Sequence, residues 1–362
     1  MKRILLTLGL FALFAGFTSA AKTLDIYFID VEGGQSTLIV TPAGQSMLID
    51  AGYGPRGGGR GGPPGAPTAP APDAPAGEAP AVSPAASSVT PAREAAGTAL
   101  TEAPGRDATR IMAAMHEAGL GRLDYVLVTH FHPDHVGGVP EVASRIPVGT
   151  FIDYGTPLGF DRMTAGGFRN YEPVRAKALH IEARAGDRLP LAGLDADIVS
   201  SGGALLEKPL GGGGDINTAC TMLEDHPEDG TENFRSVGVM FRFGRFRFLN
   251  LGDLSGNTLT RLACPKDLLG RVSVYLVAHH GDYDSNIPAL YGALRPQVAI
   301  MNNGIAKGGS PDAFKTLQAR PGMDLWQLHA SRNRGARNAP EEFLANVDDG
   351  ITSYSLRLSA NA

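Results

Sequence analysis

The segment Val128–Gly138, with the sequence VTHFHPDHVGG, places three histidines and one aspartate within six residues. It follows an apolar run typical of a buried strand, and it ends in two glycines. His130 and His132 are two residues apart, so in an extended chain their side chains point to the same side. Asp134 and His135 follow a proline, where the chain must turn, so they can point elsewhere. Two pairs of ligands aimed at two nearby points favour a dinuclear metal site.

Neither pair alone completes a tetrahedral zinc site, so further ligands must come from other parts of the chain. Two other apolar runs end in suitable residues. FLNLGDLSG places Asp253 in a turn with a glycine, and LVAHHGD places His279 and His280 beside another glycine. Five of the nine histidines lie in two such strand ends. The pattern predicts a metal site at one edge of a layered sheet structure.

The rest of the chain alternates strand-like and helix-like segments. Residues 23–30, 36–40 and 46–50 predict a β-meander, residues 106–120 a helix and residues 123–130 a buried strand that ends at His130. SVGVMFRFGRFRFLNLGD predicts a hairpin that turns near Gly244. Two β-rich halves with helices between them indicate a layered α/β fold.

The first residues and one internal segment do not resemble a folded domain. Residues 1–21 carry Lys2 and Arg3, an apolar run and then small residues, so they predict a signal peptide and a periplasmic or secreted protein. An uncleaved N-terminal anchor is the alternative, and no later segment is long and apolar enough to cross a bilayer. Residues 54–103 are rich in Pro, Gly and Ala, and predict a disordered insertion within one domain.

The charge of the chain gives no support for a nucleic-acid partner. The formal net charge is -5, and it falls to about -7 without Lys2 and Arg3. A local basic groove stays open as an alternative, although the cluster of Arg332, Arg334 and Arg337 reads as a solvated loop. The two cysteines, Cys220 and Cys264, predict either one disulfide or two free thiols.

HFHPDHVGG matches the His-x-His-x-Asp-His signature of the metallo-β-lactamase superfamily, which the chain therefore resembles. Other segments resemble one branch, the soluble metallo-hydrolase domain of competence protein ComEC and its free-standing relatives. These segments are YFIDVEGGQSTLIV, MLIDAG, RLDYVLVTHFHPDHVGG, ENFRSVGVMFRFGRFRFLNLGD and LVAHHGD. The resemblance covers residues 23–52 and 107–328. It implies a four-layer αββα sandwich, with residues 22–53 and 104–362 forming one hydrolase domain.

The resemblance also implies ligands for two metal ions. They are His130 and His132 for the first ion, Asp134 and His135 for the second, Asp253 as a bridge, and one of His279 and His280 to complete the second site. Many members of the superfamily give the first ion a third histidine before the bridging aspartate. Here His226 lies in an acidic stretch that reads as a solvated loop, and Asn233 stands where the ComEC-like branch keeps an asparagine.

The function that the resemblance implies is hydrolysis by a hydroxide bound to the metal ions. The expected catalytic residues are Asp134 and Asp253, which would orient the hydroxide and accept its proton. The expected cofactor is Zn2+, two per chain, with Mn2+ and Fe2+ as alternatives. An aspartate at the bridging position, where zinc β-lactamases have a cysteine, argues against a true β-lactamase.

By analogy with the ComEC-like branch, the expected substrate is a phosphodiester or a small molecule. The chain departs from the branch at Glu32 and Gly33, and in HHGD, where the branch has His-His-Gly-Ser. Two other functions therefore stay open. One is a hydrolase of lactones or other acyl compounds on the same site, and the other is a non-catalytic binding protein with a degenerate metal site.

Overall fold

The structure is a computed structural model that describes residues 23–55, 105–157, 161–222, 229–285, 287–347 and 350–361 of the chain. The expected signal segment, residues 1–21, lies outside the described residues. So does the expected insertion, except for Gly54 and Pro55. Across the described ranges, no helix has the length and apolar character needed to span a bilayer.

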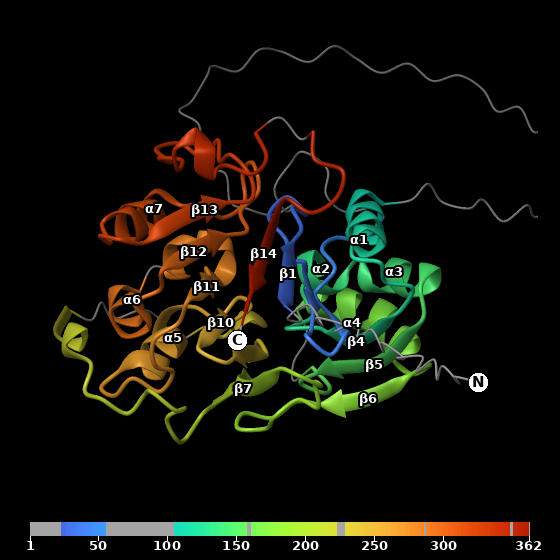
Figure 1. Ribbon diagram of the computed structural model, residues 1–362, viewed down its shortest axis with the longest axis horizontal. Coiled ribbons are helices and arrows are strands. Elements are labelled where there is room, and N and C mark those ends of the chain that lie inside the picture. The colour runs from blue at the N-terminus through green and yellow to red at the C-terminus, as the bar shows by residue number, and fades with distance from the viewer. Residues whose placement is uncertain are drawn as a thin grey trace, which may run out of the picture.

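The first sheet has seven strands in the order β14-β1-β2-β3-β4-β5-β6 (Figure 1). Their bounds are Leu24–Phe28 for β1, Thr37–Val40 for β2, Ser46–Ile49 for β3, Leu123–Leu127 for β4, Val148–Asp153 for β5, Leu179–Glu182 for β6 and Leu356–Ala360 for β14. β1, β2 and β3 form the expected antiparallel meander, whereas β3 to β6 pair in parallel. The C-terminal strand β14 closes the sheet by pairing with β1.

The second sheet also has seven strands, in the order β13-β12-β11-β10-β9-β7-β8. Their bounds are Asp195–Ser201 for β7, Ala204–Leu205 for β8, Gly238–Phe243 for β9, Phe246–Asn250 for β10, Val274–Leu276 for β11, Val298–Met301 for β12 and Asp324–Gln327 for β13. β9 and β10 form the expected hairpin around Gly244, and β10 to β13 run parallel.

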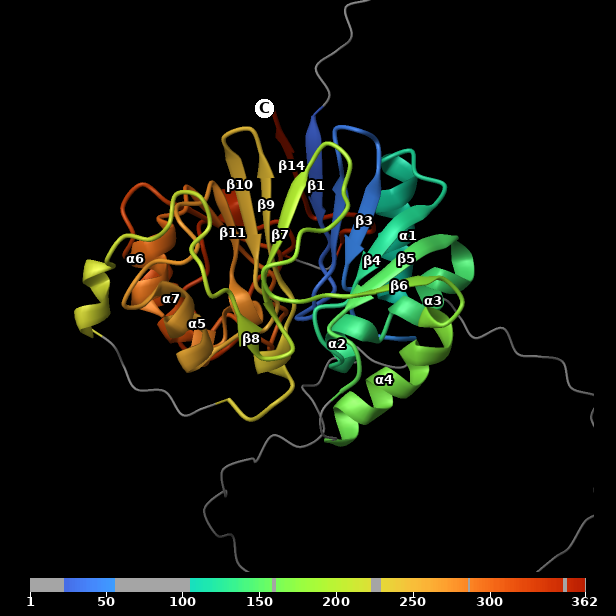
Figure 2. The same ribbon diagram turned by 90° about the horizontal axis from the view of Figure 1, so that it is seen from below.

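Helices cover the outer face of each sheet (Figure 2). The first sheet carries α1 (Arg106–Glu117), α2 (Pro133–Val136), α3 (Val139–Arg145) and α4 (Arg162–Arg175), and the second carries α5 (Gly256–Ala263), α6 (Pro288–Leu294) and α7 (Pro311–Gln318). Short 3-10 helices lie at Thr218–Met222, Asn233–Arg235, Ala278–Gly281, Tyr283–Ser285 and Glu341–Phe343. The protein therefore has the four-layer αββα architecture expected from the sequence.

The strand periodicity of β10 shows how the layers are held together. Phe248 packs edge-to-face against Phe28 of β1, with ring centroids 5.7 Å apart, so this side of β10 lies between the two sheets. The next residue, Leu249, points to the opposite side and joins the core formed with α5, α6 and α7. Alternate residues of one strand thus bury apolar surface in two different layers.

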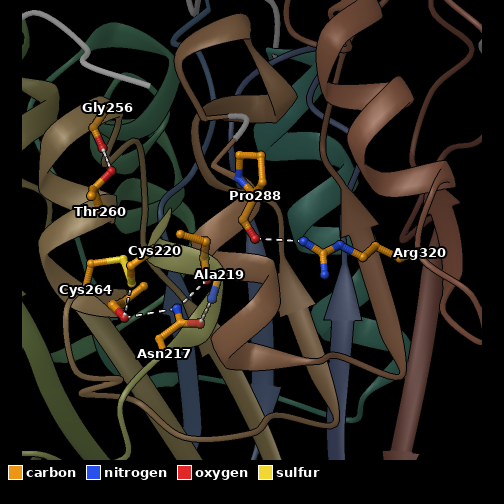
Figure 3. The surroundings of a disulfide bond; sticks show 10 residues. Asn217, Ala219, Cys220, Gly256, Thr260, Cys264, Pro288 and Arg320 are labelled. Carbon is orange, nitrogen blue, oxygen red and sulfur yellow. Dashed lines mark hydrogen bonds between the residues drawn. A yellow bond between two sulfur atoms is a disulfide. The ribbon is translucent and has the colours of Figure 1, made fainter. Parts of the chain in front are cut away.

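The two cysteines form a disulfide, which settles the question that the sequence left open (Figure 3). Cys220 and Cys264 have Cα atoms 5.8 Å apart and are separated by 44 residues. Near them, the Asn217 side-chain amide donates hydrogen bonds to the carbonyl groups of Ala263 and Ala289, at 3.1 and 2.8 Å. The long connection before β9 is therefore fixed to α5 and α6 by a covalent bond and by hydrogen bonds.

The two chain ends that flank residues 56–104 lie next to each other. A methyl group added to Gly105 would be 3.2 Å from the Cα atom of Pro55, and the Gly105 N–H donates to Glu141 Oε1 at 2.8 Å. We predict that replacing residues 56–104 by a short Gly-Ser linker leaves the unfolding temperature unchanged or slightly raised. The reason is that the free-energy cost of closing a loop falls by only about 0.6 kcal/mol each time the length of the loop is halved. Calorimetry checks this prediction, and loss of cooperative unfolding would show that the segment is structural.

Candidate metal centre

The segment HFHPDH leaves β4 and turns into the short helix α2. β4 ends at Leu127, and His132 is in the extended backbone region directly before Pro133, the first residue of α2. The turn at the proline is as expected, and it opens α2 directly. Asp134 and His135 lie in this first helical turn and are buried. The rings of His130 and His135 nevertheless lie close together, with centroids 4.1 Å apart, so the turn does not separate the two pairs of side chains.

Four buried side chains from three connections form a tight group. They are Asp134, His135, Asp253 and His280, and one ligand atom of each lies within 4.8 Å of the others. Asp253 Oδ2 is 3.1 Å from His135 Nε2 and 3.2 Å from His280 Nε2. Asp134 Oδ2 is 3.3 and 3.2 Å from the same two nitrogens. The structure thus brings Asp134, His135 and Asp253 together, as the resemblance implies for the second metal site, and adds His280, one of the two histidines that could complete it.

The other three predicted ligands lie around the same aspartate. Asp253 Oδ2 is 3.8 Å from His130 Nε2 and 3.9 Å from His279 Nε2. The His130 Nε2 atom is also 3.0 Å from His132 Nδ1. All seven residues predicted as ligands are therefore within one cluster, with Asp253 at its centre.

His279 and His280 do not alternate as residues of a strand would. β11 ends at Leu276, and both histidines adopt left-handed backbone angles in a 3-10 turn, with φ of 48° and 54°. Both rings therefore approach Asp253, whereas the resemblance implies that only one of the two histidines completes the site. Gly308 packs against this turn, and a methyl group there would be 2.2 Å from the His280 carbonyl oxygen.

Two carboxylates that no sequence pattern singles out orient His135 and His279. Asp50, directly after β3, lies 2.8 Å from His135 Nδ1 and also accepts hydrogen bonds from the backbone N–H and hydroxyl of Thr129. Asp284 Oδ1 lies 2.8 Å from His279 Nδ1. Metal-binding histidines commonly donate their second ring N–H to a carboxylate in this way. The only sequence signal for Asp50 is its place at a strand end, in MLIDAG.

Lys307, which no sequence pattern singles out, lies in the connection after β12. Its Nζ atom contacts Asp134 Oδ2, and it lies 6.0 Å from the centroid of the Tyr53 ring. Burial opposes the charge, but Asp134 outweighs it and raises the pKa of Lys307. A lysine in a glycine-rich connection gives no signal of a role by itself. Only the fold places this cation beside the histidine cluster.

The electrostatics of the cluster favour ionised carboxylates. Burial by itself would raise the pKa of Asp253, but His135 and His280 outweigh it and hold that pKa well below its usual range. Lys307 and His135 do the same for Asp134 against its burial. Burial by itself would lower the pKa of His135, but Asp253 and Asp134 outweigh it and raise that pKa well above its usual value.

The donor set fits divalent metal ions. Imidazole nitrogens and carboxylate oxygens are the ligands that Zn2+ binds in catalytic sites, and they also bind Fe2+ and Mn2+. Asp253 supports this fit, because its Oδ1 atom is buried and has no hydrogen-bond partner among the described residues. A buried, unpartnered carboxylate oxygen is costly unless a cation or donor compensates it. Asn233 lies beside this group, with Nδ2 3.3 Å from His279 Nε2, whereas His226 lies outside the described residues.

Comparison with known sequences agrees with this interpretation. Residues 101–200 match the sequence model of the metallo-beta-lactamase superfamily, and the match includes the whole HFHPDH segment. This match supports membership of that superfamily, as the signature predicts. A comparison with curated proteins finds no significant match.

Several solved structures resemble the chain weakly. A diphosphatase from the PhnP family has a TM-score of 0.39 and 10% identity, and the match covers 94% of this chain and 99% of that one. The metallo-beta-lactamase fold protein YhfI from Bacillus subtilis has a TM-score of 0.42 and 8% identity, and the match covers 84% of this chain and 96% of YhfI. The diiron beta-hydroxylase CmlA from Streptomyces venezuelae has a TM-score of 0.40 and 13% identity, and the match covers 95% of this chain. The chain spans about half, 55%, of the length of CmlA.

Proposed function

We propose that the protein is a hydrolase with a dinuclear metal centre built around Asp253. The observation that carries this proposal is the position of Asp253 Oδ2, which is 3.1 to 3.9 Å from the Nε2 atoms of four histidines. A carboxylate in this position can bridge two cations. His130, His132 and His279 would serve the first ion, and Asp134, His135 and His280 the second. His279 thus stands in for the third histidine that the sequence lacks at the usual place.

The bound ions would activate water at neutral pH and stabilise negative charge on the substrate. The chain supplies the rest of the chemistry. A carboxylate oxygen of Asp134 or Asp253 would orient the attacking water and accept its proton. Asp50 and Asp284 would hold the rings of His135 and His279 in place. Lys307 would bind an anionic oxygen of the substrate, because its ammonium group is fixed at the edge of the cluster.

The proposed substrate is a phosphodiester. The resemblance of several segments to the ComEC-like branch and the cation of Lys307 beside the cluster support this choice. The proposed place of action is the periplasm or the exterior of the cell. The leading segment supports it, and so does the disulfide, since disulfides persist in oxidising compartments.

The substrate class is tested by turnover of bis-p-nitrophenyl phosphate against a simple lactone, with the metal-loaded mature chain. The proposal expects turnover of the phosphodiester at a kcat/KM at least about tenfold higher, which corresponds to about 1.4 kcal/mol of transition-state stabilisation. Faster turnover of the lactone would favour the acyl-class hydrolase instead. If the metal-loaded chain turns over neither of these compounds nor any related ester, the result would favour a binding protein.

We predict that Lys307→Met lowers kcat/KM for a phosphodiester by about tenfold to a hundredfold. A hydrogen bond to a charged group contributes about 1.5 to 3 kcal/mol, and the variant removes it. Metal content should not fall, because Lys307 is not a ligand. The matched control is Lys315→Met on the exposed side of α7, which should leave both values unchanged. Unaltered kinetics in Lys307→Met would contradict a substrate-binding role.

A further inference from the structure

A groove rich in arginine lies at the edge of the second sheet that is opposite to the metal ligands. The β9–β10 turn is found at this edge, at the other end of the molecule from α2 (Figure 2). The pocket has a volume of about 920 Å³. Its charged lining comes from three places in the chain: Arg245 and Arg247 around the hairpin, Arg271 before β11 and Arg295 after α6. A second pocket of about 630 Å³ shares Arg271 and Arg295, and its lining also contains Asp215, Asp267 and Arg320.

Among the described residues that line the 920 Å³ pocket, no carboxylate balances these four arginines. Its lining contains no Asp or Glu, and none of the four forms an ion pair with a described residue. The contrast with Arg242 is direct, because it is the cross-strand neighbour of Arg247 and is paired with Asp197 at 2.6 Å. Arg295 donates through Nε to the Gly292 carbonyl oxygen, which leaves the other nitrogens of its guanidinium group for a ligand.

Like charges that line one pocket repel each other. A bound anion removes this repulsion and gains charge-assisted hydrogen bonds from the guanidinium groups. The pocket volume is in the range of small-molecule sites, about 300 to 1,000 Å³.

We propose that this groove binds a phosphate-bearing polyanion. Arginine presents a planar set of N–H donors that matches two oxygens of one phosphate. A chain of phosphates carries its charges at short, regular intervals, so it can meet several arginines at once. The shared chemistry covers a free oligophosphate and the backbone of a nucleic-acid strand. The net charge of -5 does not oppose binding here, because screening limits its effect to about 8 to 10 Å. This site is independent of the metal centre and of the reaction proposed for it.

The test uses the full mature chain as purified and two probes. Inorganic tripolyphosphate is titrated by calorimetry, and a fluorescent single-stranded oligothymidylate of about ten nucleotides is followed by anisotropy. The test variant is Arg245→Gln/Arg271→Gln, in which both positions are exposed. The matched control is Arg332→Gln/Arg334→Gln, which removes the same charge from an exposed loop outside the pocket. Thermal melting confirms that each variant is folded. If the double variant is not folded, the single variant Arg271→Gln is used in its place.

The proposal expects the pocket variant to raise the Kd of at least one probe by at least about tenfold, and the control to change it by less than about twofold. Binding of tripolyphosphate alone identifies a free oligophosphate as the ligand, and binding of both probes identifies a nucleic-acid strand. Affinity for the strand should fall steeply with salt. Equal losses in the two variants, a loss in the control alone, or no binding of either probe by the wild type would each overturn the proposal.

Discussion

Asp253→Asn is expected to reduce metal content from about two ions per chain to below one, and to lower kcat by about a thousandfold or more. The change keeps the shape of the side chain but removes the negative charge that faces four histidine nitrogens. Since the carboxylate is proposed to bridge both ions, its loss should weaken both positions together. A thousandfold loss corresponds to about 4 kcal/mol of transition-state stabilisation. Elemental analysis and steady-state kinetics on one preparation measure both quantities.

The control for this variant is Asp197→Asn, which removes a buried carboxylate from β7. Asp197 pairs with Arg188 and Arg242, and is outside the cluster. It should keep both ions and its activity. Both variants should retain cooperative unfolding, because the layers are held by separate apolar cores on the two sides of β10. Full metal content and activity in Asp253→Asn would remove the bridging role.

His279→Ala and His280→Ala are each expected to lose about one metal ion and to lower kcat at least about a hundredfold. The resemblance implies that only one of them binds metal, and in a strand two successive side chains would point to opposite sides. The left-handed turn changes this expectation, because it brings both rings to Asp253. His280 joins Asp134 and His135, whereas His279 is the ring oriented by Asp284.

The matched control for the two histidines is His180→Ala. His180 lies on the edge strand β6 and pairs with Asp153 at 3.0 Å, outside the cluster. It should keep both ions, so a loss there would indicate a general effect of removing histidines. If His280→Ala keeps full metal and activity, His280 is not a ligand of the second ion, and if His279→Ala does so, the first ion has another third ligand. Asn233 would then be the next residue to test.

The local patterns of the sequence predict much of the fold. Period-two alternation and apolar runs identify the meander and the β9–β10 hairpin, and Ser310 before Pro311 marks the start of α7. The pairing of β14 with β1 could not be predicted, because it joins residues more than 300 positions apart through backbone hydrogen bonds that leave no local pattern. The disulfide is similar, since only the folded chain brings Cys220 and Cys264 together.

The candidate site, like the fold, could be predicted only in part from the sequence. The spacing in HFHPDH and the glycines after the other strand ends identify the ligand types and predict that they meet at one edge. The left-handed turn at His279 is not predicted, because the apolar run before it looks like an uninterrupted strand up to the histidines. Lys307, Asp50 and Asp284 act through proximity to ligands, and a single charged residue at a strand end or in a loop has no periodicity that reveals such a partner.

Binding of two metal ions around Asp253 can be measured in the purified wild-type chain as its metal content. The protein would be produced in medium containing zinc, freed of loosely bound metal by gel filtration and measured by plasma mass spectrometry against protein concentration. We expect about two ions per chain of zinc, or of manganese or iron in its place. A wild-type chain that is folded and contains no metal would contradict this expectation.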